Sequence, residues 1–209
     1  DGKKNSILFF TTHKSASTFV DKILDELSAM SSFTRVDFDS YFTSWNEKLY
    51  LKYSNNDFLN NAFISEGIIY GPFRNYVHVP KLYKYKIILL VRDPRDVLVS
   101  SYYSFRHSHL NITKKNVQQK KELATMTIDD FVKQKAAYYF DVLNDYCTYL
   151  LNRNNVLFLK YEDMLVNYDN FIFSILQFTD DLNLKHKFEL KSKFKIKSNL
   201  NENKNKHVR

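Results

Sequence analysis

The strongest constraint on the fold is the alternation of short apolar runs with longer segments of helical periodicity. Short runs rich in Ile, Leu and Val are typical of strands that are buried on both faces of a parallel sheet. Alternating strands and helices favour an α/β fold in which helices cover that sheet. The predicted strands are residues 7–11, 34–37, 67–70, 86–91 and 155–160, and the predicted helices are residues 17–30, 41–53, 94–107, 127–152, 162–179 and about 183–196.

Length and composition predict a single domain over residues 1–209. A chain of 209 residues with 44% hydrophobic side chains is long enough to bury a core of its own. The sequence has no repeat at the periods of solenoid proteins. From about residue 199 the sequence is polar and aperiodic, which predicts a loop or tail.

The charge of the chain favours anionic partners. Lys and Arg number 31 against 23 Asp and Glu, which gives a formal charge of +8. Because basic and acidic residues are intermixed rather than gathered in one stripe, we expect no nucleic-acid partner. The charge alone does not distinguish nucleotides from sulfated glycans or an acidic membrane surface, and the oligomeric state stays open.

Cysteine content and hydropathy predict a cytoplasmic protein without a transmembrane segment. Cys147 is the single cysteine and lies in an apolar helical pattern, where we expect it to pack in the core. A chain with one cysteine forms no internal disulfide, which is typical of a reducing compartment. The apolar runs are shorter than the ~20 residues that span a bilayer. The spacing of histidines and cysteine predicts no metal site.

A cationic turn rich in hydroxyl groups links the first strand to the first helix. Lys14, Ser15, Ser17 and Thr18 occupy this turn, between the apolar run 7–11 and a helical pattern. Backbone N–H groups at a helix start lack partners within the helix and lie at the positive end of its dipole. The turn therefore predicts a phosphate-binding loop of the nucleotide-binding type.

A second anion-binding segment begins where the run 86–91 ends. Asp93 is suited to cap the following helix, and Pro94 is suited to its first position. Arg92 then lies at the strand end, where its guanidinium can bind a phosphate in two hydrogen bonds, and Ser100 faces nearly the same way as the helix start. The alternative is an ordinary ion pair of Arg92 with Asp93 or Asp96.

A third segment, Tyr161-Glu162-Asp163, follows the run 155–160 and offers an aromatic ring that can flank a nucleobase. The alternative is a buried tyrosine beside two carboxylates that favour a helix N-terminus. In a parallel sheet the carboxyl ends of all strands share one edge. The three segments, together with residues 71–74, are therefore predicted to converge.

Together these segments resemble the sulfotransferases that use 3'-phosphoadenosine 5'-phosphosulfate (PAPS), whose fold is related to nucleotide kinases. Residues 14–18 resemble the family's 5'-phosphosulfate loop, Arg92 and Ser100 its 3'-phosphate motif, and Tyr161 the tyrosine near the adenine. The resemblance spans residues 7 to about 165 and implies a three-layer α/β sandwich with PAPS as co-substrate and no metal. It implies nucleotide contacts by His13, Lys14, Ser15, Ala16, Ser17, Thr18, Phe19, Arg92, Ser100, Tyr161 and Arg209.

Two residues depart from the family pattern, and a third, at the end of the chain, is a further possible match to it. Ala16 replaces a glycine, and because alanine tolerates positive φ poorly we expect the loop to stay in ordinary backbone space, with Ala16 entering the helix. Phe19 replaces a tryptophan and is expected to stack on the adenine. Arg209 matches the start of a basic segment that closes over the 3'-phosphate, or else belongs to a solvated tail.

The resemblance implies transfer of a sulfuryl group to a hydroxyl or amine of a small molecule, lipid or carbohydrate. Lys14 is the expected catalytic cation, because charge develops on the bridging oxygen of the donor. Residues 71–74 contain no histidine where many family members have their base. The candidate bases are therefore Asp39 and His13, with Asp37 and Glu66 besides.

Three other functions stay open at this stage. A P-loop nucleoside-phosphate kinase would share the Lys14-Ser15 pair, although the glycines of its motif are missing. A basic module could bind polyanions without catalysis. A noncatalytic relative could keep the nucleotide fold and bind the donor without turnover.

Overall fold

The fold is built on one parallel sheet. The computed structural model describes residues 4–37, 62–107, 122, 125–179 and 182–202. Five strands pair in the order β2-β3-β1-β4-β5, and every pairing is parallel, as the sequence predicts. The strands are β1 (Ile7–Thr11), β2 (Thr34–Asp37), β3 (Ile68–Phe73), β4 (Lys86–Val91) and β5 (Val156–Lys160).

The order of the strands fixes where a ligand can bind. β3 and β4 pair with opposite sides of β1, so the chain reverses its direction of growth across the sheet at β1. In open α/β sheets the loops that follow the strands diverge at such a point and leave a crevice at the carboxyl ends. The turn after β1 lies at this crevice.

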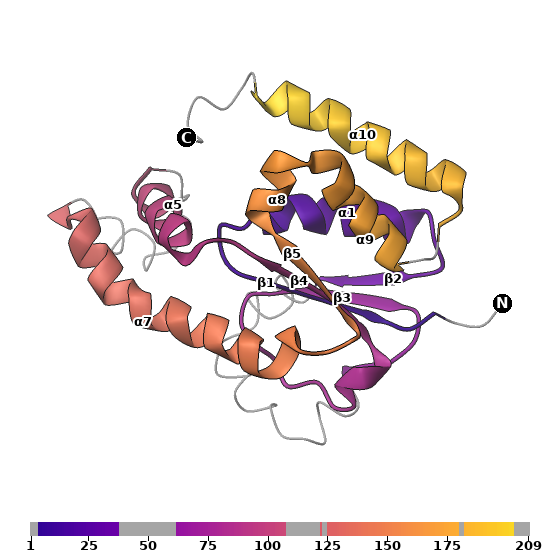
Figure 1. The fold of residues 1–209 in the computed structure, drawn as a ribbon, viewed down its shortest axis with the longest axis horizontal. Helices are drawn as coiled ribbons and strands as arrows, with labels where there is room; N and C mark the ends of the chain where they lie inside the picture. The colour runs from indigo at the N-terminus through magenta and orange to yellow at the C-terminus, as the bar shows by residue number, and fades with distance from the viewer. Residues whose placement is uncertain (1–3, 38–61, 108–121, 123–124, 180–181, 203–209) are drawn as a thin grey trace.

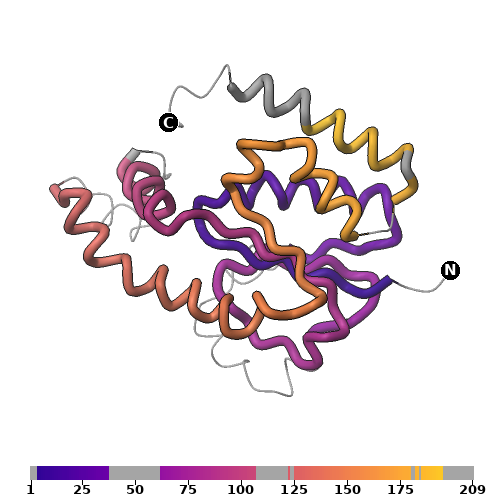
Figure 2. Tube along the Cα trace, viewed as in Figure 1, coloured from indigo at the N-terminus to yellow at the C-terminus, as the bar shows by residue number. Residues whose placement is uncertain are grey.

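Helices cover both faces of the sheet (Figure 1). One face carries α1 (Ser17–Ala29), α8 (Tyr161–Val166), α9 (Tyr168–Thr179) and α10 (Leu184–Glu202), and the other carries α7 (Ile128–Tyr146). The trace in Figure 2 shows β1 and β4 running to the same end of the sheet before the chain turns into α1 and α5 (Pro94–His107). This is the three-layer α/β sandwich that the sequence predicts.

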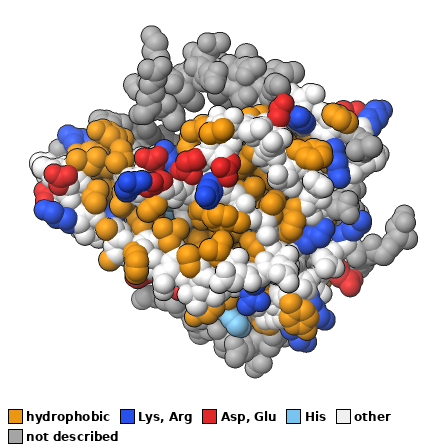
Figure 3. All heavy atoms as spheres, in the orientation of Figure 1, with side chains coloured by type: hydrophobic (Ala, Val, Ile, Leu, Met, Phe, Trp, Pro, Cys, Tyr) orange, Lys and Arg blue, Asp and Glu red, His pale blue; other side chains and the backbone are white. Residues whose placement is uncertain are grey.

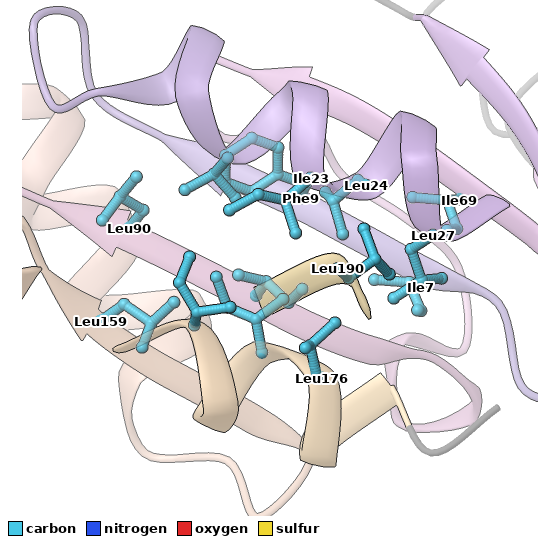
Figure 4. Packing of buried hydrophobic residues seen from close by; sticks show 14 of the residues in the cluster. Ile7, Phe9, Ile23, Leu24, Leu27, Ile69, Leu90, Leu159, Leu176 and Leu190 are labelled. Carbon is cyan, nitrogen blue, oxygen red and sulfur yellow. The ribbon is translucent and has the colours of Figure 1, made fainter. Parts of the chain in front are cut away.

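The sheet has a hydrophobic core on each of its two faces, because successive side chains of a strand point to opposite faces. Ile7 and Phe9 of β1 pack toward α1 and α9, whereas Leu8 and Phe10 pack toward the opposite layer. Figure 4 shows the first core, in which leucine and isoleucine side chains of the sheet interlock with those of the helices. Each apolar face of the sheet is thus covered, which holds the strand ends in fixed positions.

Three predicted helices differ in extent from the structure, and one of them, predicted over about 183–196, continues as α10 to Glu202, into the segment predicted as a loop or tail. The predicted helix 162–179 is two helices, because Asn167 leaves helical geometry with φ −143° and its side chain accepts a hydrogen bond from the Asn170 N–H (3.0 Å), which caps α9. The predicted helix 127–152 passes into one π-helical turn at Cys147–Leu151. Cys147 is exposed there, so the prediction that it packs in the core was wrong. The predicted helix 41–53 lies outside the described residues.

A buried tyrosine of α7 ties two strand ends together. The hydroxyl of Tyr146 lies 2.8 Å from the carbonyl oxygen of Thr11 and 3.2 Å from that of Phe73. Burial raises the pKa of this phenol, so the hydroxyl keeps the proton that it donates. The contact fixes the ends of β1 and β3, which border the crevice.

None of the described helices is both long enough and apolar enough to cross a membrane.

Candidate functional site

The backbone of the turn after β1 adopts two left-handed residues. Lys14 has φ 61° and Ala16 has φ 60°, with Ser15 between them. The expectation that Ala16 keeps the loop in ordinary backbone space was therefore wrong: Ala16 is the residue before α1 and is left-handed itself (φ 60°, ψ 27°). Alternation of ordinary and left-handed residues points successive N–H groups toward one side, which is the geometry of an anion-binding nest. Strain of this kind concentrates at binding sites because the neighbouring structure enforces it.

This strain gives a first testable prediction. Ala16→Gly should leave the free energy of unfolding unchanged or raise it by up to ~1 kcal/mol, because glycine adopts this φ without the steric cost that alanine incurs. Urea unfolding of the two proteins measures the difference. A clear loss of stability would mean that Ala16 is not strained in solution.

Lys14 extends from this turn toward α5. Its Nζ lies 2.5 Å from the Ser104 hydroxyl, across two segments that are 90 residues apart in sequence. Partial burial lowers the pKa of Lys14, and the positive charge of Arg74 lowers it further. The result is an ammonium group held in place and more acidic than an ordinary lysine.

Arg92 joins the second predicted segment to the first. Its Nη1 donates a hydrogen bond to the Lys14 carbonyl oxygen at 3.0 Å, and its guanidinium carbon lies 4.2 Å from the centre of the Tyr161 ring. The alternative ion pair is present too, since Nη2 lies 3.5 Å from an Asp96 carboxylate oxygen. The Nε atom of Arg92 is buried and has no hydrogen-bond partner among the described residues. A buried donor without a partner is costly, so this atom marks a place where a ligand acceptor fits.

The start of α5 is built as its sequence predicts. An Asp93 carboxylate oxygen accepts a hydrogen bond from the Arg95 N–H at 2.9 Å, which caps the helix. The Arg95 guanidinium beside this carboxylate lowers the pKa of Asp93 to about 2. The Asp93 N–H in turn donates to a Glu162 carboxylate oxygen at 3.0 Å, so the segments after β4 and β5 are linked directly.

Two site residues were missed by the sequence analysis. Arg74 follows β3, and its Nη1 donates to the Ser17 hydroxyl at 2.8 Å. Sequence reasoning placed residues 71–74 at this edge but gave Arg74 no role, because the segment was considered only for a histidine base. Ser104 lies one helical turn beyond Ser100, on the same face of α5, so helical periodicity was the signal that could have identified it.

The other predicted residues lie as follows. Thr18 is exposed, and His13 and Ser100 are half-buried. Phe19 packs between Tyr168 and Phe194, with ring centres 5.8 and 5.7 Å away, so contact with an adenine stays a prediction. Asp39 and Arg209 lie outside the described residues.

The two remaining candidate bases lie at opposite edges of the sheet. Glu66 forms a bridge with Asn5 before β3 begins, at the amino ends of the strands, which removes it as a candidate. Asp37 ends β2 at the carboxyl edge and is exposed. The described residues contain no group of three or more His, Cys, Asp or Glu side chains that could hold a metal ion.

Comparison with known proteins identifies the family. A mouse protein named Sulfotransferase 2A6 is 36% identical over 83 residues, which cover 39% of this chain and 26% of that protein. The crystal structure of mouse sulfotransferase SULT7A1 complexed with PAP matches 93% of this chain and 65% of its own, with a TM-score of 0.60 and 19% identity. A retinol dehydratase in complex with retinol and PAP matches 92% of this chain and 65% of its own, with a TM-score of 0.53 and 18% identity.

These likenesses differ in what they establish. At 19% and 18% identity the two structures establish a shared fold, and this chain spans less than two thirds of the length of either. The model of the sulfotransferase domain, by contrast, matches residues 4–207, which is nearly the whole chain. The resemblance drawn from the three motifs is thereby confirmed, and the chain belongs to the sulfotransferase domain family.

Proposed function

We propose that this chain transfers a sulfuryl group from PAPS to a hydroxyl or amine of an acceptor. The observation that carries the proposal is the contact between Arg92 and the Lys14 carbonyl, because it joins two anion-binding segments into one site. PAPS carries a phosphosulfate and a separate phosphate, so a ligand of this kind needs two cationic subsites at a fixed separation. The acceptor is a small molecule, lipid or carbohydrate.

The residues present fit such a donor. The turn after β1 offers N–H groups at a helix start and the Lys14 ammonium, which suits the 5'-phosphosulfate. The buried Nε of Arg92, without a partner among the described residues, suits an oxygen of the 3'-phosphate. The Tyr161 ring lies against the Arg92 guanidinium, so a phosphate bound by Arg92 would bring the nucleotide beside this ring. PAP, the product of the reaction, is bound in both similar structures.

The chemistry follows from the charges at the site. PAPS supplies an activated sulfuryl group. The bond between its sulfur and the bridging phosphate oxygen breaks as a bond forms between that sulfur and the oxygen or nitrogen of the acceptor. In this proposal the Lys14 ammonium neutralises the charge that develops on that oxygen, and its lowered pKa supports the role because it makes the group a stronger hydrogen-bond donor. His13 and Asp37, with Asp39 outside the described residues, stay the candidates for the base that takes the acceptor proton.

The face of the molecule in Figure 3 does not favour a simple polyanion-binding module. On the face in Figure 3, basic side chains are scattered and several lie beside acidic ones. A protein that binds a polyanion through its charge gathers basic residues into a patch or stripe.

The location in the cytoplasm is part of the proposal, supported by the single, unpaired Cys147.

Incubation with PAPS and a panel of phenols, alcohols, amines and oligosaccharides tests the function, with mass spectrometry detecting the addition of one SO₃ group. We expect at least one acceptor to be modified without added divalent metal. Binding of PAP without modification of any acceptor would favour the noncatalytic relative. Dependence on Mg²⁺ and ATP would favour the kinase.

Arg92→Ala should weaken binding of PAP by about 10- to 100-fold, because a charge-assisted hydrogen bond is lost and the ring of Tyr161 loses its cationic neighbour. Calorimetric titration measures the change. Lys160→Ala removes an exposed cation from the strand before Tyr161 and serves as the matched control. Equal affinity of Arg92→Ala and wild type would remove Arg92 from the site.

A further inference from the structure

Arg74 is a third cation at the carboxyl edge of the sheet, beside the two that the sequence motifs identify. It follows β3 directly, is half-buried, and reaches the first residue of α1 through the 2.8 Å hydrogen bond to Ser17. We propose that Arg74 is a positioning residue, which acts through the Ser17 hydroxyl and through its charge beside Lys14 to hold the anion-binding turn ready for the donor. This inference rests on the proposed function, because it assigns the anion to the 5' group of PAPS.

The hydrogen bond determines how Ser17 can be used. A serine hydroxyl has one proton to donate and accepts through its lone pairs. Because a lone pair of Ser17 accepts from Arg74, the hydroxyl proton is available in another direction. Ser17 starts α1, at the mouth of the turn, so this arrangement favours donation toward an anion held at the helix start.

The position of Arg74 is itself fixed by its surroundings. β3 is buried along most of its length, and the Tyr146 hydroxyl binds the Phe73 carbonyl immediately before Arg74. The Asn75 side chain accepts a hydrogen bond from the Tyr138 hydroxyl of α7 at 2.8 Å, immediately after it. Because both neighbours of Arg74 are anchored, its backbone is already fixed, and the contact with Ser17 costs mainly the freedom of the arginine side chain itself.

The charge of Arg74 also acts on the catalytic lysine. Lys14 is surrounded by Arg74 after β3, by Arg92 after β4, by Ser104 on α5 and by His13 on its own turn, with Tyr138 of α7 near Arg74. Burial is the first cause that lowers the pKa of Lys14, and Arg74 is the charge that lowers it further. A lowered lysine pKa means that the charged form is lost at a lower pH. Removal of the Arg74 charge should therefore move this pKa up.

Arg74→Gln and Arg74→Lys separate charge from geometry, and Ser17→Ala removes the hydroxyl that Arg74 contacts. Lys133→Gln removes an exposed cation of α7 and is the matched control. Two readouts are needed. Calorimetry measures PAP affinity, and pH-dependent labelling of the Lys14 amine with acetic anhydride, read by mass spectrometry, measures the midpoint of its titration without any ligand or acceptor.

We expect Arg74→Gln to weaken PAP binding by about tenfold or more and to shift the Lys14 midpoint to higher pH. Arg74→Lys should keep the midpoint near that of wild type, and Ser17→Ala should reduce the effect of Arg74→Gln on affinity when the two are combined. Lys133→Gln should change neither readout. If Arg74→Gln does not fold, Ser17→Ala alone tests the contact: it removes the hydroxyl that Arg74 binds and should weaken PAP binding, whereas wild-type affinity in Ser17→Ala would overturn the role of the contact.

The outcomes distinguish this inference from the function on which it rests. Wild-type affinity and an unchanged midpoint in Arg74→Gln would overturn the role of Arg74, as would equal effects of the Gln and Lys variants on the midpoint. Failure of the wild-type chain to bind PAP would instead contradict the proposed function. In that case the labelling experiment would still show whether Arg74 controls Lys14.

Discussion

Lys14→Met should lower kcat of sulfuryl transfer by about 10²- to 10³-fold, with a much smaller effect on the fold. The charge on the bridging oxygen grows as the bond to sulfur breaks, so a preorganised cation stabilises the transition state more than the ground state. Lys14 is preorganised by its contact with Ser104 and by the left-handed backbone of its own residue. Steady-state kinetics on the acceptor that the panel identifies measures the loss.

Methionine retains most of the length of the lysine side chain, replaces one methylene by sulfur and removes the ammonium group. Circular dichroism melting should therefore give similar curves for both proteins, since Lys14 is only partly buried. Lys22→Met, on the outer side of α1, is the matched control and should keep wild-type kcat. A loss of less than about tenfold in Lys14→Met would show that another group carries the charge.

Gly71→Ala should destabilise the protein by on the order of 3 kcal/mol. Gly71 in β3 has φ 123°, which side chains rarely adopt, and a Cβ atom there would lie 2.5 Å from the backbone oxygen of Phe9. That oxygen belongs to β1, the central strand, so it cannot move aside without breaking the sheet. The pairing of β1 with β3 shifts register between Leu8 and Phe10, beside this close approach.

Gly67→Ala supplies the control for this prediction. Gly67 also has positive φ (77°), but a Cβ atom there would meet nothing within 4 Å. Its substitution should cost about 1 kcal/mol, which is the backbone term alone. Urea unfolding of both variants measures the difference, and equal losses would show that the approach of β3 to β1 is not the cause.

The sequence predicts most of the fold because three of its strands, β1, β3 and β4, are buried along most of their length and appear as apolar runs. The run Lys86–Val91, for example, is predicted as a strand, and the strand in the structure has the same bounds. β3 was predicted three residues short because Gly71 and Pro72 break the apolar run, although neither breaks the strand. The division between α8 and α9 was missed because Asn167 acts through its side-chain cap, which changes no hydrophobic period.

The site was predicted where a local motif carries it and missed where distant segments meet. Arg92 follows a predicted strand directly and Lys14 lies in the turn after another, so the rule for strand ends brings them together. The left-handed backbone of Ala16 runs against its residue type, and only the structure reveals it. The contacts of Arg74 with Ser17 and of Lys14 with Ser104 join residues 57 and 90 positions apart. Helical periodicity can place Ser104 on the face of Ser100, but no local pattern indicates either contact.

The most direct test of the account is a calorimetric titration of the wild-type chain with PAP, compared with ATP in the presence and absence of Mg²⁺. The account predicts saturable binding of PAP that needs no divalent metal, with ATP weaker because it lacks the 3'-phosphate that Arg92 is placed to bind. Binding of ATP with Mg²⁺ in preference to PAP would contradict it and would make a nucleotide kinase the better description of the site.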